Sequence, residues 1–285
     1  MYAQAFTTWL QRRNIHFSWI VVAITFMTML TSSAALGLPG ALLQPLGREF
    51  GWNTDQISTA LAIRFILYGL IGPFAAILME RIGLRRVICT ALALVAACLL
   101  LSTQMTQLWH LFVLWGLVLG VGTGMTALVL GAVVANRWFE TRRGLVIGML
   151  TASAATGQLI FLPAAAWLIE HYGWRMAVIP VFCSCVLTAV LALLFIRNRP
   201  QELGITPYGA TADTSAPAPQ ARMTMWEPLR MLAAASGNRT FWILAGTFFI
   251  CGLSTSGLIQ THFISLCGDY GLSAVPAASV LAMMG

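Results

Sequence analysis

The stretch at residues 73–88, PFAAILMERIGLRRVI, returns ninety positions later at residues 163–178 as PAAAWLIEHYGWRMAV. Seven of the sixteen positions are identical, and among them are the Pro, the Glu, the Gly and one Arg. Chance alone gives roughly one or two identities in so apolar a composition. Three apolar runs separate the two copies. If each run crosses a membrane, the copies lie on opposite faces, which is typical of an inverted-topology repeat.

The composition places the chain in a lipid bilayer. Hydrophobic residues make up 59% of the sequence and charged residues 9%, and the mean hydropathy is +0.82. A soluble globular domain carries about a quarter charged residues, so that class is excluded. A membrane-spanning helix needs about 20 apolar residues, and seven runs meet this length. These predicted spans are residues 17–43, 57–79, 87–105, 108–134, 144–169, 176–196 and 241–263, and an eighth run opens near Ala274.

The sixteen basic residues are all arginines, and their positions predict how the chain is oriented. Thirteen of them, beginning with Arg12 and Arg13, precede the first span or follow the second, fourth and sixth spans. Only Arg48 and Arg175 fall in the alternate connections. Because basic residues accumulate in cytoplasmic loops, we expect a multi-pass protein of the cell membrane with a cytoplasmic N-terminus. The net charge of +7 then reflects topology, and no basic stripe with interleaved aromatics points to nucleic acid.

Three parts are expected along this all-α, multi-pass helical bundle. Residues 1–196 form a six-helix half made of two inverted three-helix repeats. Residues 197–239 form a cytoplasmic linker rich in Pro, Ala, Thr and Gly, in which residues 225–235 are predicted to be an amphipathic helix on the membrane surface. Residues 240–285 start a second half and end inside an apolar run, so we expect a shortened form of a protein with about twelve spans.

The connection between the second and third spans carries a family signature. It reads Glu80-Arg81-Ile82-Gly83-Leu84-Arg85-Arg86 and resembles the signature loop of the major facilitator superfamily, in which Gly, an acidic residue and a basic residue precede a second Gly and two basic residues. The acid and the second Gly are kept. Glu stands for the usual Asp, Ala76 replaces the leading Gly, and Leu84 takes a place where a basic residue is common. The six-helix half, the long central loop and the repeat extend the resemblance over the whole chain.

Four segments, FSWIVVAITF, REFGWNTDQIS, RWFETRRGLVIGM and EHYGWRMAV, look like the monocarboxylate and oxalate-formate porter branch of that superfamily. Its drug-proton antiporters fit less well, since Phe161 and Leu162 replace their Gly-Pro and Gly116 replaces their functional Arg. The resemblance therefore implies a secondary active transporter of small organic anions, such as mono- or dicarboxylates, that works by alternating access. An exporter of drugs or other hydrophobic compounds and a transporter-like membrane sensor are the alternatives.

Arg64 is the only charged side chain inside a predicted span and the first candidate for binding substrate. It lies roughly 10 Å below the membrane face. A charge at that depth costs on the order of 2.5 to 3.5 kcal/mol, so it faces protein or a water-filled cavity. A guanidinium stays ionised and binds a carboxylate through two parallel hydrogen bonds, which suits an anionic substrate. The alternative is a structural arginine bonded to helix carbonyls.

Further substrate contacts are predicted on helices that line the cavity in the family fold. Tyr68 shares the Arg64 face of its helix, either as a donor to the same carboxylate or as a buried tyrosine bonded to a neighbouring helix. The remaining candidates are Thr25, Thr28 and Ser32 in the first span, Thr151 and Gln158 in the fifth, and Ser256 and Gln260 in the seventh. Each also fits a plain packing role, because Ser and Thr commonly pack between membrane helices.

Glycines in the fourth span predict close helix packing. Gly116, Gly120 and Gly124 are spaced by four residues, so their faces align on one side of a helix. Small residues at this spacing let two backbones approach closely in a membrane. A phosphate-binding loop is excluded, since no strand precedes these glycines and no Lys follows them.

The resemblance also implies a gate at the cytoplasmic mouth that holds the outward-open state. Its predicted residues are Glu80, Arg81, Gly83, Arg85 and Arg86, with Arg137, Arg142 and Arg143 as cationic partners of Glu80. The alternative is an exposed loop whose charges only set topology.

No enzyme, metal site or cofactor is predicted. The six cysteines show neither metal spacing nor a redox pair, and residues 252–256 lack the second Gly of a nucleophile elbow. The expected partners are a small-molecule substrate, a carboxylate in this interpretation, and the lipid bilayer. No Asp or Glu lies within a predicted span, so the sequence assigns no coupling ion.

Overall fold

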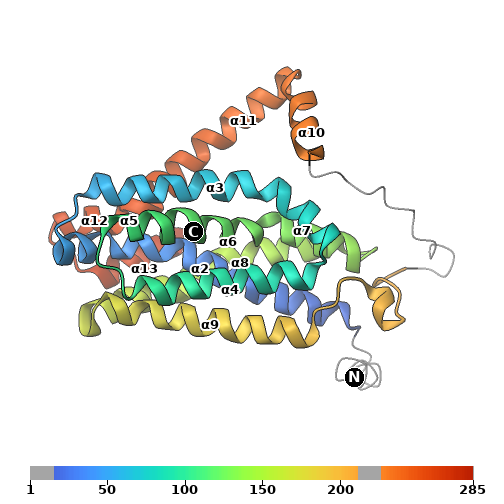
Figure 1. Ribbon diagram of the computed structural model, residues 1–285, viewed down its shortest axis with the longest axis horizontal. Coiled ribbons are helices and arrows are strands. Elements are labelled where there is room, and N and C mark those ends of the chain that lie inside the picture. Colours follow the sequence, from blue (N-terminus) through green and yellow to red (C-terminus); the bar gives the residue numbers. More distant parts are fainter. Residues whose placement is uncertain (1–15, 211–225, 285) are drawn as a thin grey trace.

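The computed structural model describes residues 16–210 and 226–284, which form a bundle of long helices (Figure 1). Within these residues, seven helices are long and apolar enough to cross a membrane, and no β-strand is formed. The predicted all-α, multi-pass bundle is therefore confirmed. Arg12, Arg13 and Met225, which entered the predictions of topology and of the surface helix, lie outside the described residues.

The helices follow the predicted spans in order. The first three are α2 (Ser18–Phe50), α3 (Thr54–Arg81) and α4 (Leu84–Ser102). The fourth span is a rod made of α5 (Leu108–Leu111), the π-helix η1 (Phe112–Val118), α6 (Leu119–Met125) and α7 (Leu128–Trp138). The fifth and sixth are α8 (Arg143–Tyr172) and α9 (Trp174–Phe195). Beyond them lie η2 (Pro200–Leu203), α10 (Glu227–Ser236), α11 (Arg239–Gly252), the π-helix η4 (Leu253–Ile259), α12 (Gln260–Asp269) and α13 (Ala274–Met284).

The first helix extends beyond its predicted end at residue 43. Hydropathy marks where the chain leaves the hydrocarbon, whereas the backbone hydrogen bonds of α2 continue past Pro39 and Pro45 to Phe50. Gly51 ends the helix in the left-handed conformation, with φ +68°, and its N–H donates to the carbonyl of Gly47. This is an ordinary glycine stop signal, placed about two turns beyond the apolar run.

Helix packing follows the repeat. Helix α2 packs along α8, α3 packs along the fourth span, and α4 packs along α9. The repeat makes α2, α3 and α4 equivalent to the fourth span, α8 and α9. Under this exchange, the α2–α8 contact becomes the contact of α3 with the fourth span, and the α4–α9 contact becomes itself. Both copies of the repeated sequence also turn at their shared glycine, since Gly83 has φ +97° and Gly173 has φ +86°. The repeat is therefore present in backbone conformation as well as in sequence.

The two copies lie at opposite ends of the bundle (Figure 1). The first copy contacts Arg137 and Asn198, at the end where α2 begins; we call this the N-terminal end. In the second copy, Arg175 pairs with Glu49 at 2.7 Å and donates to the carbonyl of Thr103 at 2.9 Å. Those residues define the opposite end, so the arrangement agrees with an inverted repeat.

The seventh span packs on the bundle through α12, toward the opposite end. There, Gln44 donates to the carbonyl of Ser265 at 2.9 Å, and the backbone N–H of Ala274 donates to Glu170 at 3.0 Å. Helix α12 thereby packs on α2, and α13 packs on α8. Helix α11, in contrast, leaves the bundle toward α10 and has no buried residue (Figure 1).

The first part of the predicted linker is folded onto the six-helix bundle. The N–H of Tyr208 donates to the carbonyl of Trp138 at 2.9 Å, and the N–H of Glu140 donates to that of Tyr208 at 3.0 Å. We call residues 197–208 the strap. Further along, α10 covers most of the predicted amphipathic helix, and the side chains of Trp226, Leu229 and Leu232 are exposed along it.

We predict that Gly83→Ala lowers stability more than Gly173→Ala. Both changes put a Cβ on a backbone conformation that is nearly confined to glycine, at a cost of about 1 to 3 kcal/mol each. At position 83 that Cβ also lies 2.5 Å from Oδ1 of Asn198, whereas at position 173 nothing lies within 4 Å. Thermal unfolding of the purified variants, followed by the reactivity of the buried thiols, measures the difference. Equal shifts of the two midpoints would show that Asn198 moves aside without cost.

Candidate substrate site and gate

Arg64 lies where α3 crosses the glycines of the fourth span. A Cβ on each glycine would meet a backbone oxygen of α3, with Gly116 at 3.3 Å from Ala60, Gly120 at 3.0 Å from Arg64 and Gly124 at 3.1 Å from Tyr68. The two helices therefore approach one another turn by turn, as the glycine spacing predicts. Any larger residue at these positions pushes α3 and Arg64 away from the fourth span.

The Arg64 side chain points into the bundle, since only 1% of it is exposed. Its Nη1 donates to the carbonyl of Leu36 at 3.0 Å, and its guanidinium lies 4.6 Å from the ring centre of Phe65. Among the described residues, its Nε has no hydrogen-bond partner although it is buried. A buried cation with an unused donor is costly, so this edge of the guanidinium is suited to an additional acceptor.

Two other predicted contacts come together beside the same turn of α2. Nε2 of Gln260 donates to Oε1 of Gln158 at 3.3 Å, which joins α12 to α8. A Cβ at Gly37 would lie 3.6 Å from the Gln158 side chain, and one at Gly40 would lie 2.5 Å from the carbonyl of Gln260. Residues 36–40 of α2 are thus reached from three different helices, by Arg64, Gln158 and Gln260. Pro39 lies in this turn and has no N–H to donate to the helix.

The remaining hydroxyl candidates are mostly bonded to their own helices. Thr25 donates to Val21 at 2.7 Å and Thr28 donates to Ile24 at 2.9 Å, and both threonines are fully buried. Ser32 bonds to Thr126 at 2.7 Å across to the fourth span. These three residues therefore pack the interior of the six-helix bundle.

Three further candidates lie outside this interior packing. Thr151 is exposed and bonded to the carbonyl of Ile147, and Ser256 lies half-buried in η4. Tyr68 is half-buried one turn beyond Arg64. The structure thus gathers Gln158 and Gln260 near the turn that Arg64 contacts, but not the full predicted set.

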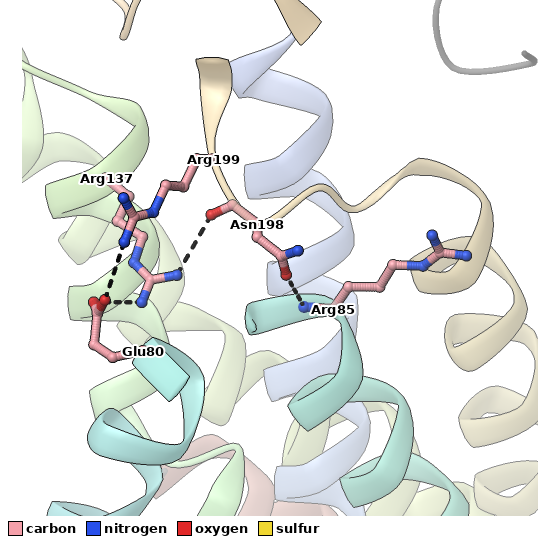
Figure 2. Close-up of polar contacts among 5 residues, drawn as sticks. All are labelled: Glu80, Arg85, Arg137, Asn198 and Arg199. Carbon is pink, nitrogen blue, oxygen red and sulfur yellow. Dashed lines mark hydrogen bonds and ion pairs between the residues drawn. The ribbon is translucent and has the colours of Figure 1, made fainter. Parts of the chain in front are cut away.

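The signature loop forms a charged cluster at the N-terminal end, shown in Figure 2. Glu80 makes an ion pair with Arg137 and a second one, at 3.6 Å, with Arg199. Nη1 of Arg137 donates to the carbonyl of Asn198 at 3.4 Å, and Oδ1 of Asn198 accepts from the N–H of Arg85 at 3.2 Å. The cluster connects the second, third and fourth helices to the strap.

The other predicted gate residues have different positions. Arg143 donates from Nε to the carbonyl of Phe139 at 2.6 Å, and Arg142 has the left-handed φ of +61° at the start of α8. Neither makes an ion pair with Glu80 within the described residues. Arg81 and Arg86 are exposed. Of the three predicted cationic partners of Glu80, the structure places Arg137 against it.

Sequence reasoning missed Asn198 and Arg199, because both lie in the predicted linker. A usable signal was present directly after them. The stretch Pro200-Gln201-Glu202-Leu203-Gly204 has Pro at the start and Gly at the end of a short helix, and it forms η2. Such a helix so close to the end of a membrane span indicates a packed segment rather than a free linker.

Six spans arranged as inverted repeats, with an interior arginine and a charged loop at one end, define a multi-pass helical membrane protein. Residues 21–285 match the family model of the Major Facilitator Superfamily, and the chain belongs to this family.

Relatives of known sequence include monocarboxylate transporters. The chain is 27% identical over 266 residues to monocarboxylate transporter 13 of Rattus norvegicus, covering 93% of this chain and 57% of that protein. It is 27% identical over 270 residues to monocarboxylate transporter 11 of Mus musculus, covering 93% and 55%. It is 22% identical over 264 residues to the uncharacterized MFS-type transporter YcxA of Bacillus subtilis (strain 168), covering 93% and 61%. The chain therefore spans somewhat more than half the length of these relatives.

A solved structure has the same fold. It is a bacterial homolog of the human lysosomal transporter Spinster, in an inward-facing and unoccupied conformation. The TM-score is 0.67 at 18% identity, and the match covers 93% of this chain and 58% of that chain.

We predict a larger energetic coupling between Glu80 and Arg137 than between Glu49 and Arg175. The side chains of the first pair are 32% and 10% exposed, and those of the second are 39% and 45% exposed. Exposed pairs couple by about 0.2 to 1 kcal/mol, because water and salt screen them. For the more buried pair we expect about 1 to 3 kcal/mol. Double-mutant cycles with Glu→Gln and Arg→Gln changes, read as unfolding midpoints, measure both couplings, and equal values would contradict the prediction.

Proposed function

We propose that the protein is a secondary active transporter of small organic anions, such as mono- or dicarboxylates, with Arg64 as the anion anchor. The observation that carries the proposal is the buried Arg64 side chain, whose Nε is left without a partner among the described residues. A carboxylate oxygen satisfies such a donor and neutralises the charge at the same time. The names of the monocarboxylate transporter relatives support the same substrate class.

Residues 36–40 of α2 are the centre of the proposed site. The carbonyl of Leu36 holds one nitrogen of Arg64, and the Gln158–Gln260 pair lies beside Gly37 and Gly40. The Gln158–Gln260 contact joins the six-helix bundle to the seventh span, so it must break when the two parts rock apart. A bound carboxylate offers oxygens to both amides, which links substrate binding to that movement.

Contacts at the two ends support a mechanism of alternating access. At the opposite end, the Gln44–Ser265 and Glu170–Ala274 hydrogen bonds join the bundle to α12 and α13. At the N-terminal end, we assign gating to the signature loop with Arg137, Arg142 and Arg143, as the resemblance implies. Opening one end while the other is closed exposes the site to each side of the membrane in turn.

The direct test is uptake of labelled carboxylates by proteoliposomes that contain the full-length transporter. We expect Arg64→Ala to lower kcat/KM about 10- to 100-fold, the usual effect of losing a charged hydrogen-bond partner. Arg64→Lys should transport little better than Arg64→Ala, because an ammonium cannot form the two parallel hydrogen bonds of a guanidinium. Arg48→Ala, an exposed arginine in α2, is the matched control and should transport normally.

Carboxylate uptake that is undiminished in Arg64→Ala would remove this residue from the site. Labelled lactate and pyruvate test monocarboxylates, and labelled oxalate and succinate test dicarboxylates. Efflux of hydrophobic dyes without any carboxylate flux would instead favour the exporter alternative, and specific binding without any flux would favour a sensor.

The proposed orientation places the N-terminal end in the cytoplasm. The arginine distribution supports it, because the connections at this end carry most of the basic residues. Single cysteines at Ile82 and Tyr172, both exposed, lie at the two ends of the bundle. In intact cells, an impermeant maleimide should label a cysteine at 172 at least tenfold faster than one at 82, and permeabilisation should equalise the two rates. The reverse labelling pattern would invert the topology.

A further inference from the structure

We propose that Asn198 is a positioning residue of the gate, which holds Arg137 and the signature loop in place through the strap. The inference rests on the proposed gating function. Asn198 contacts neither substrate nor Glu80 in the described contacts, so it acts through the residues that it orients.

Asn198 joins both sides of the charged cluster (Figure 2). Its backbone carbonyl accepts from Nη1 of Arg137 at 3.4 Å, and its side-chain oxygen accepts from the N–H of Arg85 at 3.2 Å. The next residue, Arg199, reaches the second oxygen of Glu80 at 3.6 Å. Removing the Asn198 side chain therefore takes no charge from the gate but frees the segment that aligns two of its arginines.

The contact with Arg85 caps helix α4 from a distant part of the chain. The first N–H groups of a helix have no partner within the helix, and a side-chain oxygen normally satisfies one of them. Gly83, at the N-cap position of α4, has no side chain for this purpose. Its missing Cβ instead leaves room for Asn198, since a Cβ there would lie 2.5 Å from the Asn198 oxygen. The signature glycine and Asn198 are thus two parts of one contact.

Glu202 fixes Asn198 in this orientation. Its two carboxylate oxygens accept from the backbone N–H of Asn198 at 3.2 Å and from the side-chain Nδ2 at 3.1 Å. With Nδ2 engaged there, Oδ1 is directed at Arg85. Glu202 lies in η2, so the short helix after the sixth span sets the orientation of the cap.

The far end of the strap is anchored on the fourth helix as well. Tyr208 exchanges backbone hydrogen bonds with Trp138 and Glu140, and its ring lies 5.5 Å from that of His16 and 5.9 Å from that of Trp19. Asn198 contacts Arg137 and Tyr208 contacts the adjacent Trp138, so both ends of the strap are bonded to the end of α7.

The test measures the conformation of the full-length transporter and needs no substrate. Spin labels at Thr90 and Thr240, both exposed, report the distance across the N-terminal end in a background with all cysteines replaced. We expect Asn198→Ala to change the ratio of open to closed populations at this end about fivefold toward open, the usual effect of losing one capping hydrogen bond. Gln201→Ala, an exposed change in the same short helix, is the matched control and should leave the ratio within its error.

A reversed pair separates positioning from a loss of folding. Asn198→Asp alone keeps the acceptor for Arg85 but places a second carboxylate against that of Glu202, which repels it. Asn198→Asp combined with Glu202→Gln exchanges the acid and the amide, and should restore the wild-type ratio of open to closed populations. A ratio unchanged in Asn198→Ala, or no restoration in the reversed pair, would overturn the inference. If the ratio shifts as expected while no carboxylate is taken up by the wild type, the substrate assignment fails and the role of Asn198 stands.

Discussion

Close contact of helix backbones at glycines is the constraint on which the rest of this structure depends. Lipid tails are as apolar as leucine, so membrane helices gain little from burying apolar side chains and depend on tight packing instead. The α3 backbone lies against the fourth span at Gly116, Gly120 and Gly124, and the start of α12 lies against α2 at Gly40. These crossings fix where Arg64 and Gln260 lie.

The crossing at Gly120 also explains how a charge is accommodated amid hydrocarbon. Because the α3 backbone lies directly against the fourth span there, the Arg64 side chain is directed away from lipid and reaches the carbonyl of Leu36. That bond and the ring of Phe65 offset part of the cost of burial. Nε of Arg64 is left without a partner within the described residues, so part of the cost of burial is not offset. In the proposed function, a bound carboxylate supplies that missing acceptor.

Much of the fold could be predicted from the sequence, because the length of an apolar run and the spacing of its glycines are properties of a single helix. The repeat is equally visible, since it compares equivalent positions. Side-chain partners between remote segments could not. Periodicity showed that Thr25 and Thr28 share a face with Ser32, but it did not show that the two threonine hydroxyls return to their own helix carbonyls. In the same way, the pairing of Gln158 with Gln260 depends on the crossing of two helices with α2. Asn198 was missed because its partner, Arg85, is more than a hundred residues away.

The two copies of the repeat share a backbone conformation, but their side chains have different partners. The two ends of the protein are therefore held by different contacts. Glu80 pairs with arginines of the six-helix bundle and its strap, whereas the equivalent Glu170 accepts the backbone N–H of Ala274 at the start of α13. One copy of the repeat therefore ties its own bundle together, and the other ties the bundle to the helices that follow. Salt weakens the ion pairs of Glu80 at the N-terminal end and the Glu49–Arg175 pair within the bundle at the opposite end. Hydrogen bonds from an amide and to the Glu170 carboxylate join that opposite end to α12 and α13. In the alternating-access cycle proposed above, opening each end of the protein therefore breaks different contacts.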